Sequence, residues 1–176
     1  MAEMVVNGVS TRKVSKVVET LCGFSISKSA VSDLLKELDE AVEAFKNRPL
    51  TDHYPFVVID ATYFKVREDH KIISKAFMIA YATNSEGYRD IIGFGVYPNE
   101  SKETWTEFLK SLKARGLKDV RIFVSDAHEG IKHAISKEFP ETPWQRCQFH
   151  FTRNIIDKVP KKYIEGMKTE LNEMLN

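Results

Sequence analysis

The sequence has few of the features that define several large protein classes. No stretch of about 18 consecutive apolar residues occurs, so no transmembrane helix is predicted. The segment Met1–Val6 lacks a basic head and a long apolar core, so we expect no signal peptide. Two cysteines, Cys22 and Cys147, are too few for a disulfide framework and indicate reduced thiols. We therefore expect a soluble cytoplasmic protein with no membrane partner.

The chain also lacks a strong excess of charge of either sign. Its 26 basic and 25 acidic residues leave a net charge of +1, so bulk electrostatics neither require nor exclude a polyanionic partner. By contrast, 43% of the 176 residues are apolar and 11% are aromatic. This composition is sufficient for one well-cored domain with a small appendage.

Helical periodicity marks the N-terminal region. The first pattern begins at Ser10 and stops at Gly23, and Ser27 can act as the N-cap of a second helix that runs to about residue 47. Two helices joined by a short turn are compatible with a DNA-binding helix-turn-helix, but an ordinary helical hairpin whose charges face water explains the pattern equally well. The candidate DNA-binding residues are Arg12, Lys13, Lys28, Ser29 and Ser32.

A segment with two prolines, residues 47–55, separates these helices from a region in which strands predominate. The pattern that follows predicts three strands with short turns, a helix, a strand, a helix, a short strand and a last helix that Pro160 ends. This order predicts an α/β fold of the ribonuclease-H-like type, in which an antiparallel three-strand meander and parallel strands form a mixed sheet flanked by helices. We predict a helical appendage over residues 1–47, a ribonuclease-H-like core over 55–160 and the start of a further helical segment over 161–176.

Two aspartates end apolar runs of this core. Asp60 follows Phe56-Val57-Val58-Ile59, and Asp126 follows Ile122-Phe123-Val124-Ser125. A buried carboxylate is costly unless it is paired, and two carboxylates brought together by a sheet can hold a divalent metal ion. Taken singly, each has a structural explanation: Asp60 as a capped or salt-bridged strand residue, and Asp126 as the N-cap of a helix beginning at Ala127.

The spacing of Cys147 and His150, C-x-x-H, supplies half of a zinc site. A structural zinc ion needs four ligands and the sequence has no second such pair, so we do not expect zinc. His128, close to Asp126, can contribute to the metal site, although we expect a structural role for it.

Four motifs carry a resemblance to a known family. They occur in the order and spacing found in the transposases of bacterial Mutator-type insertion sequences, and the chain resembles this family over almost its whole length. The motifs are Asn7–Val14, Val58–Tyr63, Val124–Gly130 and Trp144–Asn154.

The resemblance implies a D-D-E metal triad in which Asp60 and Asp126 match the first two acids. It implies that Cys147 and His150 match a C-x-x-H signature near the active site that does not bind zinc. It further implies DNA cleavage and strand transfer with Mg²⁺, for which Mn²⁺ can substitute. The implied partners are transposon terminal inverted repeats, target DNA and, in the full-length form, further copies of the protein at the nucleoid.

The chain departs from the family in its length, because members continue beyond the equivalent of residue 176 to the third acid, a glutamate. Glu165, Glu170 and Glu173 match the start of the helical insertion and do not replace that glutamate. We therefore expect this chain alone to have little or no transposition activity. The alternative is a non-catalytic DNA-binding remnant that acts through the helices of residues 10–45 and interferes with full-length relatives.

Overall fold

The computed structural model describes residues 10–23 and 25–175 and most of their side chains. Residues 7–9 of the first motif lie outside this part. The side chains that are not described belong to Thr11, Arg12, Lys28, Ser32, Leu34, Leu35 and Glu37. The chain divides into two compact units, Met1–Arg48 and Pro49–Asn176.

The first unit contains the two predicted helices, α2 (Thr11–Cys22) and α3 (Lys28–Asn47). The predicted N-cap Ser27 is confirmed, and Ser10 caps α2 in the same way: each hydroxyl accepts a hydrogen bond from the backbone N–H three residues further on. Gly23 ends α2 in the left-handed conformation, with φ of +74°. A small core made of Val14, Val18, Val31 and Ile26 holds the two helices together.

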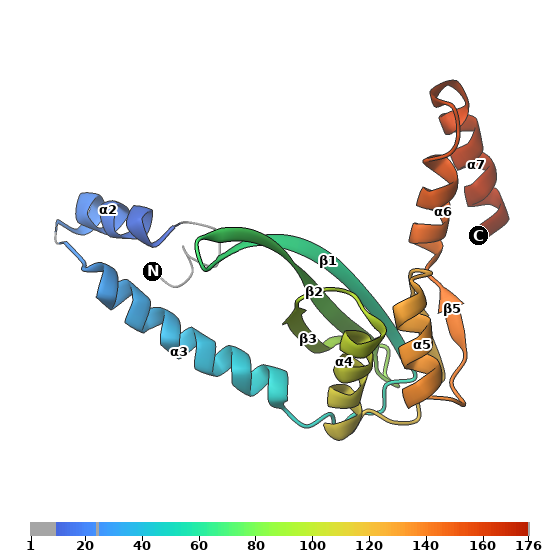
Figure 1. Ribbon diagram of the computed structural model, residues 1–176, viewed down its shortest axis with the longest axis horizontal. Helices are drawn as coiled ribbons and strands as arrows, with labels where there is room; N and C mark the ends of the chain where they lie inside the picture. The colour runs from blue at the N-terminus through green and yellow to red at the C-terminus, as the bar shows by residue number, and fades with distance from the viewer. Residues whose placement is uncertain (1–9, 24, 176) are drawn as a thin grey trace. The chain divides into compact units, whose positions relative to one another are not determined.

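The second unit is built on a five-stranded sheet with the strand order β3-β2-β1-β4-β5. β1, β2 and β3 form an antiparallel meander, and β4 and β5 add to it in parallel. This order confirms the predicted mixed, ribonuclease-H-like α/β fold (Figure 1). The strands are β1 (Phe56–Glu68), β2 (Lys71–Thr83), β3 (Arg89–Tyr97), β4 (Ile122–Ser125) and β5 (Trp144–Arg146).

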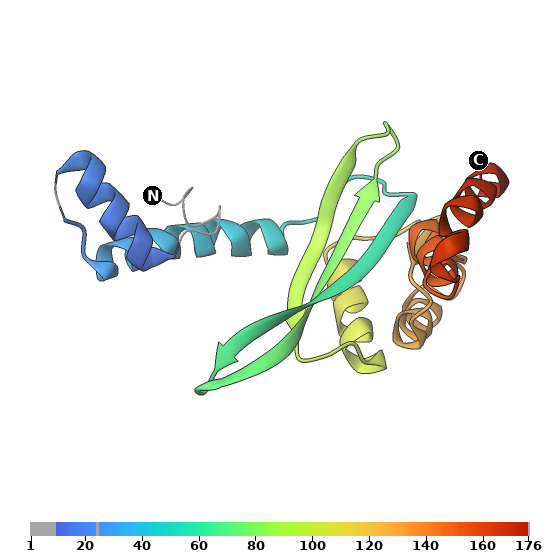
Figure 2. The same cartoon turned by 90° about the horizontal axis from the view of Figure 1, so that it is seen from above.

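β1 and β2 are longer than the rest of the sheet. Beyond Val58 the first strand no longer pairs with β4, and the β1–β2 ribbon continues past β3 to a tight turn (Figure 2). Asp69 and His70 form that turn with φ of +48° and +63°. Positive φ at both central residues is what a two-residue hairpin turn requires if its twist is to match the strands.

Helices α4 (Lys102–Ala114) and α5 (Glu129–Glu138) pack against each other and cover one face of the sheet (Figure 1). The core beneath them includes Val57, Ile59 and Phe123, which are almost fully buried. Because side chains alternate along a strand, Val58 and Asp60 lie on the opposite face of β1.

Three helical segments follow the last strand. α6 (Gln148–Ile156) begins right after β5, and a single 3₁₀ turn, η1 (Lys161–Tyr163), leads into α7 (Ile164–Leu175). None of the described helices combines the length and the apolar character needed to cross a membrane.

Gly116, which follows the end of α4, cannot carry a side chain without strain. Its φ is +113°, and a Cβ built there would lie 2.7 Å from the carbonyl oxygen of Leu50. Gly87, in the turn before β3, has a similarly positive φ of +89° but has open space around it. Comparing alanine substitutions at Gly116 and Gly87 therefore separates the cost of backbone strain from the cost of steric overlap.

We predict that Gly116→Ala lowers the free energy of unfolding by at least about 1 kcal/mol more than Gly87→Ala. Both variants force a non-glycine residue to a positive φ, at about 1–2 kcal/mol each, and only the first also displaces Leu50. Chemical denaturation of the two variants measures the difference. Equal losses of stability would contradict the prediction.

Candidate active site

The parallel pairing of β1 with β4 places Asp60 beside Asp126. The register pairs Phe56 with Ile122 and Val58 with Val124. The pairing ends there and β4 ends at Ser125, but the same register continued by two residues would reach Asp60 and Asp126. Because an even step along a strand keeps a side chain on the same face, we expect the two aspartates to share the face opposite the core.

Each aspartate is half-buried and uses one carboxylate oxygen within the protein. Asp60 Oδ1 accepts a hydrogen bond of 2.9 Å from the Ala61 N–H, and Asp126 Oδ1 accepts one of 3.1 Å from the His128 N–H. Among the described residues, neither Oδ2 atom has a hydrogen-bond partner and neither carboxylate has a lysine or arginine partner. Neighbouring carboxylates without a counter-charge repel, and such repulsion favours a shared cation.

The donor set fits Mg²⁺ or Mn²⁺. Mg²⁺ is held in proteins by one or two carboxylates and completes its octahedron with water and substrate phosphates. Within residues 10–23 and 25–175, no group of three or more His, Cys, Asp or Glu side chains is arranged to hold an ion. An open site with two protein ligands is therefore the arrangement that these residues support.

Asp126 is not the helix cap that its position suggested. The helix α5 begins only at Glu129, and its N-cap is His128, whose Nδ1 accepts a hydrogen bond of 3.2 Å from the Gly130 N–H. The alternative explanation of Asp126 as the N-cap of a helix beginning at Ala127 is therefore wrong, because the helix starts three residues after Asp126. The expected structural role of His128 is confirmed, and Asp126 Oδ2 has no hydrogen-bond partner among the described residues.

Cys147 is the N-cap residue of α6 and directly follows β5. Its N–H donates a hydrogen bond of 2.6 Å to the carbonyl oxygen of Ser125, the residue before Asp126. The C-x-x-H motif therefore starts next to the second aspartate. His150, one turn into α6, is half-buried, and its Nδ1 has no hydrogen-bond partner within the described part of the chain.

Glu100 is an acidic residue near this site that sequence reasoning missed. It lies in the loop between β3 and α4, and its N–H donates a hydrogen bond of 3.2 Å to Tyr63 Oη on β1. The carbonyl carbon of Ser101 would lie only 3.2 Å from a Cβ on Gly130, so the loop packs closely against the first turn of α5. These two contacts hold Glu100 between β1 and the loop that carries Asp126.

The pKa of Glu100 reflects the same neighbours. Burial raises the pKa of Glu100 most, the charges of Asp126 and Asp60 raise it further, and His128 and Trp105 act in the opposite direction. The Trp105 indole is fully buried, and its Nε1 has no hydrogen-bond partner that meets the geometric criteria among the described residues. The indole therefore lies near the Glu100 carboxylate and favours its ionised form without forming a well-aligned hydrogen bond.

A single signal in the sequence could have indicated Glu100. β3 runs parallel to β1 and β4, so its carboxyl end leaves the sheet at the same edge as theirs. An acidic residue in the loop after β3 is then a candidate for a site at that edge, but this inference needs the strand order as well as the residue.

The first unit contains the candidate DNA-binding residues. Lys13 is exposed on α2, and Ser29 is exposed on α3, where its hydroxyl lies 2.8 Å from that of Ser27. Arg12, Lys28 and Ser32 lie in the same two helices, but their side chains fall outside the described part of the structure.

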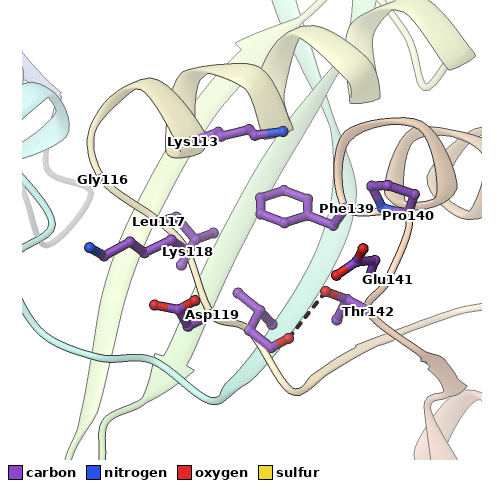
Figure 3. A pocket seen from close by; sticks show the side chains of 10 residues that line it. Lys113, Gly116, Leu117, Lys118, Asp119, Phe139, Pro140, Glu141 and Thr142 are labelled. Carbon is purple, nitrogen blue, oxygen red and sulfur yellow. Dashed lines mark hydrogen bonds between the residues drawn. The ribbon is translucent and has the colours of Figure 1, made fainter.

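A hollow on the second unit lies away from the aspartates (Figure 3). Its walls come from the end of α4 and from the segments that precede β4 and β5, so it lies at the edge where these strands begin, whereas Asp126 follows the end of β4. Its polar groups already serve the fold: Lys113 Nζ donates to the Glu138 carbonyl at 2.7 Å, and Thr142 Oγ1 donates to the Val120 carbonyl at 3.1 Å. We assign no function to it.

The strand order and the helices that cover one face define a ribonuclease-H-like domain. Residues 1–176 match the family model described as "Transposase, Mutator family". The chain belongs to this family, as the four motifs suggested.

Curated relatives agree with this assignment. The chain is 50% identical over 163 residues to the transposase for insertion sequence element IS256 in transposon Tn4001 of Staphylococcus aureus, a match that covers 92% of this chain and 42% of the relative. It is 43% identical over 171 residues to the transposase for ISRM5 of Rhizobium meliloti, covering 97% of this chain and 43% of the relative. The chain thus spans less than half the length of either relative.

A solved structure, the Mos1 strand transfer complex, resembles this chain with a TM-score of 0.38 and 13% sequence identity, over 82% of this chain and 55% of the other. A likeness at this level carries no argument, and the fold assignment rests on the strand order.

We predict that Asp126→Asn lowers the pKa of Glu100 because it removes a neighbouring negative charge. An NMR titration of the Glu100 side-chain carboxyl carbon measures the shift, with Asp69→Asn in the distant hairpin turn as the control. Because the folded-state pKa of Glu100 is raised, its ionisation lowers stability as the pH rises from the usual glutamate pKa through the folded value. The Asp126→Asn variant should lose less stability over that interval, and an unchanged Glu100 pKa would contradict the prediction.

Proposed function

We propose that this chain is the part of a Mutator-family transposase that carries the first two acids of the active site and a DNA-binding unit. The complete protein would bind transposon ends and perform metal-dependent DNA cleavage and strand transfer. The observation that supports the proposal is the β1–β4 register from Phe56–Ile122 to Val58–Val124, which would bring Asp60 and Asp126 level on one face if it continued by two residues. Family membership supports it.

Asp60 and Asp126 would hold Mg²⁺ or Mn²⁺ between their free oxygens. A divalent ion in such a site polarises a phosphodiester and favours attack on it by water or a DNA hydroxyl. The backbone N–H groups of Ala61 and His128 fix one oxygen of each carboxylate, which orients the other oxygen toward the shared position. Asp60 lies on the central strand β1, and Asp126 directly follows the neighbouring strand β4. The sheet would therefore keep the separation of the two aspartates nearly constant.

The C-x-x-H motif would support this arrangement from the side of β5. The hydrogen bond from the Cys147 N–H to Ser125 ties the start of α6 to the residue before Asp126. We assign Cys147 and His150 to positioning the Asp126 loop, and we do not assign them to ligating a metal ion.

The third acid of the triad would lie outside residues 1–176. The described residues contain no group of three ligands, and the curated relatives are more than twice as long as the matched region. We therefore expect the chain alone to show little or no strand transfer.

DNA binding would reside in the first unit. α2 and α3 form a two-helix unit, and Lys13 and Ser29, near the first turns of these helices, are exposed. In this interpretation Arg12, Lys13 and Lys28 neutralise DNA phosphates, and Ser29 and Ser32 lie where the second helix would meet base edges. The bound DNA would be the terminal inverted repeats, and the full-length protein would act as a homo-oligomer on target DNA in the cytoplasm.

We predict that this chain binds Mn²⁺ and that Asp60→Asn and Asp126→Asn each weaken binding by about tenfold or more, because each removes one of two protein ligands. Electron paramagnetic resonance of free Mn²⁺ measures the affinity without any need for activity. Asp39→Asn, an exposed position on α3, is the control. Unchanged affinity in both site variants would remove the metal site from the proposal.

We predict that neutralising Arg12, Lys13 and Lys28 together abolishes salt-sensitive binding to duplex DNA. Each lost phosphate contact lowers the slope of log K against log salt by about 0.9, so the triple variant should lose up to about 3. The control is Lys36→Gln with Lys46→Gln, because Asp33 and Glu43 already pair these two lysines. DNA binding that survives the triple variant would rule out this surface.

Mn²⁺ affinity and salt-sensitive DNA binding, measured together, also distinguish a transposase core from a non-catalytic remnant. A chain that binds DNA through the first unit but does not bind Mn²⁺ would be a DNA-binding remnant of the family. Binding of both would support the catalytic assignment.

A further inference from the structure

Three acidic side chains from three different parts of the second unit lie close enough to influence one another. Asp60 comes from β1, Asp126 follows β4, and Glu100 comes from the loop before α4. The position of Glu100 does not depend on its own side chain, because its N–H is bound to Tyr63 Oη and the next residue packs against Gly130. The backbone therefore brings this carboxylate to the site.

The arrangement is unfavourable without a cation. Glu100 is partly buried, and burial and the two aspartates all act against its ionised form. No lysine or arginine pairs with Glu100 in the described part of the chain, and none pairs with either aspartate. The neighbouring group that can carry a positive charge is His128, whose Nδ1 is engaged by the Gly130 N–H. A divalent cation would relieve the repulsion among all three carboxylates.

A second feature is a buried hydrogen-bond donor near Glu100, the indole N–H of Trp105, which favours the ionised carboxylate without forming a well-aligned hydrogen bond to it. Trp105 is fully buried in the core, yet its Nε1 has no partner among the described residues. A buried N–H is stabilised by an acceptor, and the Glu100 carboxylate is the acceptor near this one. A carboxylate has two oxygens, so one of them can accept from this N–H while the other faces a bound water or ion.

We propose that Glu100 is a third carboxylate beside the metal site, facing the cation held by Asp60 and Asp126 through one water molecule while the Trp105 N–H orients it. This inference rests on the proposed metal site. It assigns a further positioning residue within this chain, distinct from the third acid of the family triad. Glu100 would raise the affinity for the cation and fix its position before DNA binds.

Mn²⁺ titration of the intact chain tests the proposal. Glu100→Gln keeps the shape and the ability to accept a hydrogen bond but removes the charge, and we expect about tenfold weaker Mn²⁺ binding, within the range for residues that support metal ligands. Glu107→Gln, at an exposed position on α4, should leave the affinity unchanged. A thermal unfolding curve of each variant in the absence of metal excludes a general loss of structure.

A second readout reports on Glu100 and Trp105 directly. In the wild-type chain, Mg²⁺ should shift the indole N–H resonance of Trp105 as the Glu100 carboxylate turns toward it, and Glu100→Gln should remove most of that shift. Wild-type Mn²⁺ affinity and an unchanged indole response in Glu100→Gln would overturn the inference.

The outcomes distinguish this inference from the proposed function. If Asp60→Asn and Asp126→Asn weaken Mn²⁺ binding while Glu100→Gln does not, the metal site stands and the role of Glu100 is wrong. If the wild-type chain binds no Mn²⁺, the metal site and the role of Glu100 both fail.

Discussion

The parallel pairing between β1 and β4 is the constraint on which the candidate site depends. The paired segment is only three residues long on each strand, from Phe56 to Val58 and from Ile122 to Val124. Burial fixes its register, because Val57 and Phe123 are fully buried on the core side. A slip by one residue would turn these side chains away from the core, and would also move Asp126 away from the face that carries Asp60. The hydrophobic core therefore sets the separation of the two charges.

The N-termini of α4 and α5 are capped by residues other than Glu100 and Asp126. Carboxylates close to a helix N-terminus commonly act as caps. In this chain Ser101 and Thr104 form a reciprocal capping box for α4, and His128 caps α5. Because other side chains satisfy the helix N-termini, Glu100 and Asp126 keep carboxylate oxygens for another ligand. Glu100 lies one residue before its helix cap, and Asp126 lies two residues before its own.

Local patterns in the sequence predicted most of the fold. The N-cap Ser27, the change from strand to helix after Pro98 and the short strand at Trp144 all depend on neighbouring residues, and the structure confirms them. The family assignment was predictable for the same reason, since its motifs are continuous segments. The start of the helix after Asp126 was predicted too early, because the chain from Asp126 to His128 has no periodicity that marks where the helical hydrogen bonds begin.

Glu100 could not be found in this way, since no motif surrounds it and its importance comes from Tyr63 and Gly130, which are 37 and 30 residues away along the chain. The sequence by itself determined the family, the strand order and the two aspartates, because hydrophobic periodicity and continuous motifs encode them locally. Only the tertiary structure decided which carboxylates share one edge of the sheet, which helix ends are capped by other residues, and that the hollow beside Lys113 lies away from the acids. These properties depend on contacts between residues far apart in the chain, and the packing of the core fixes those contacts.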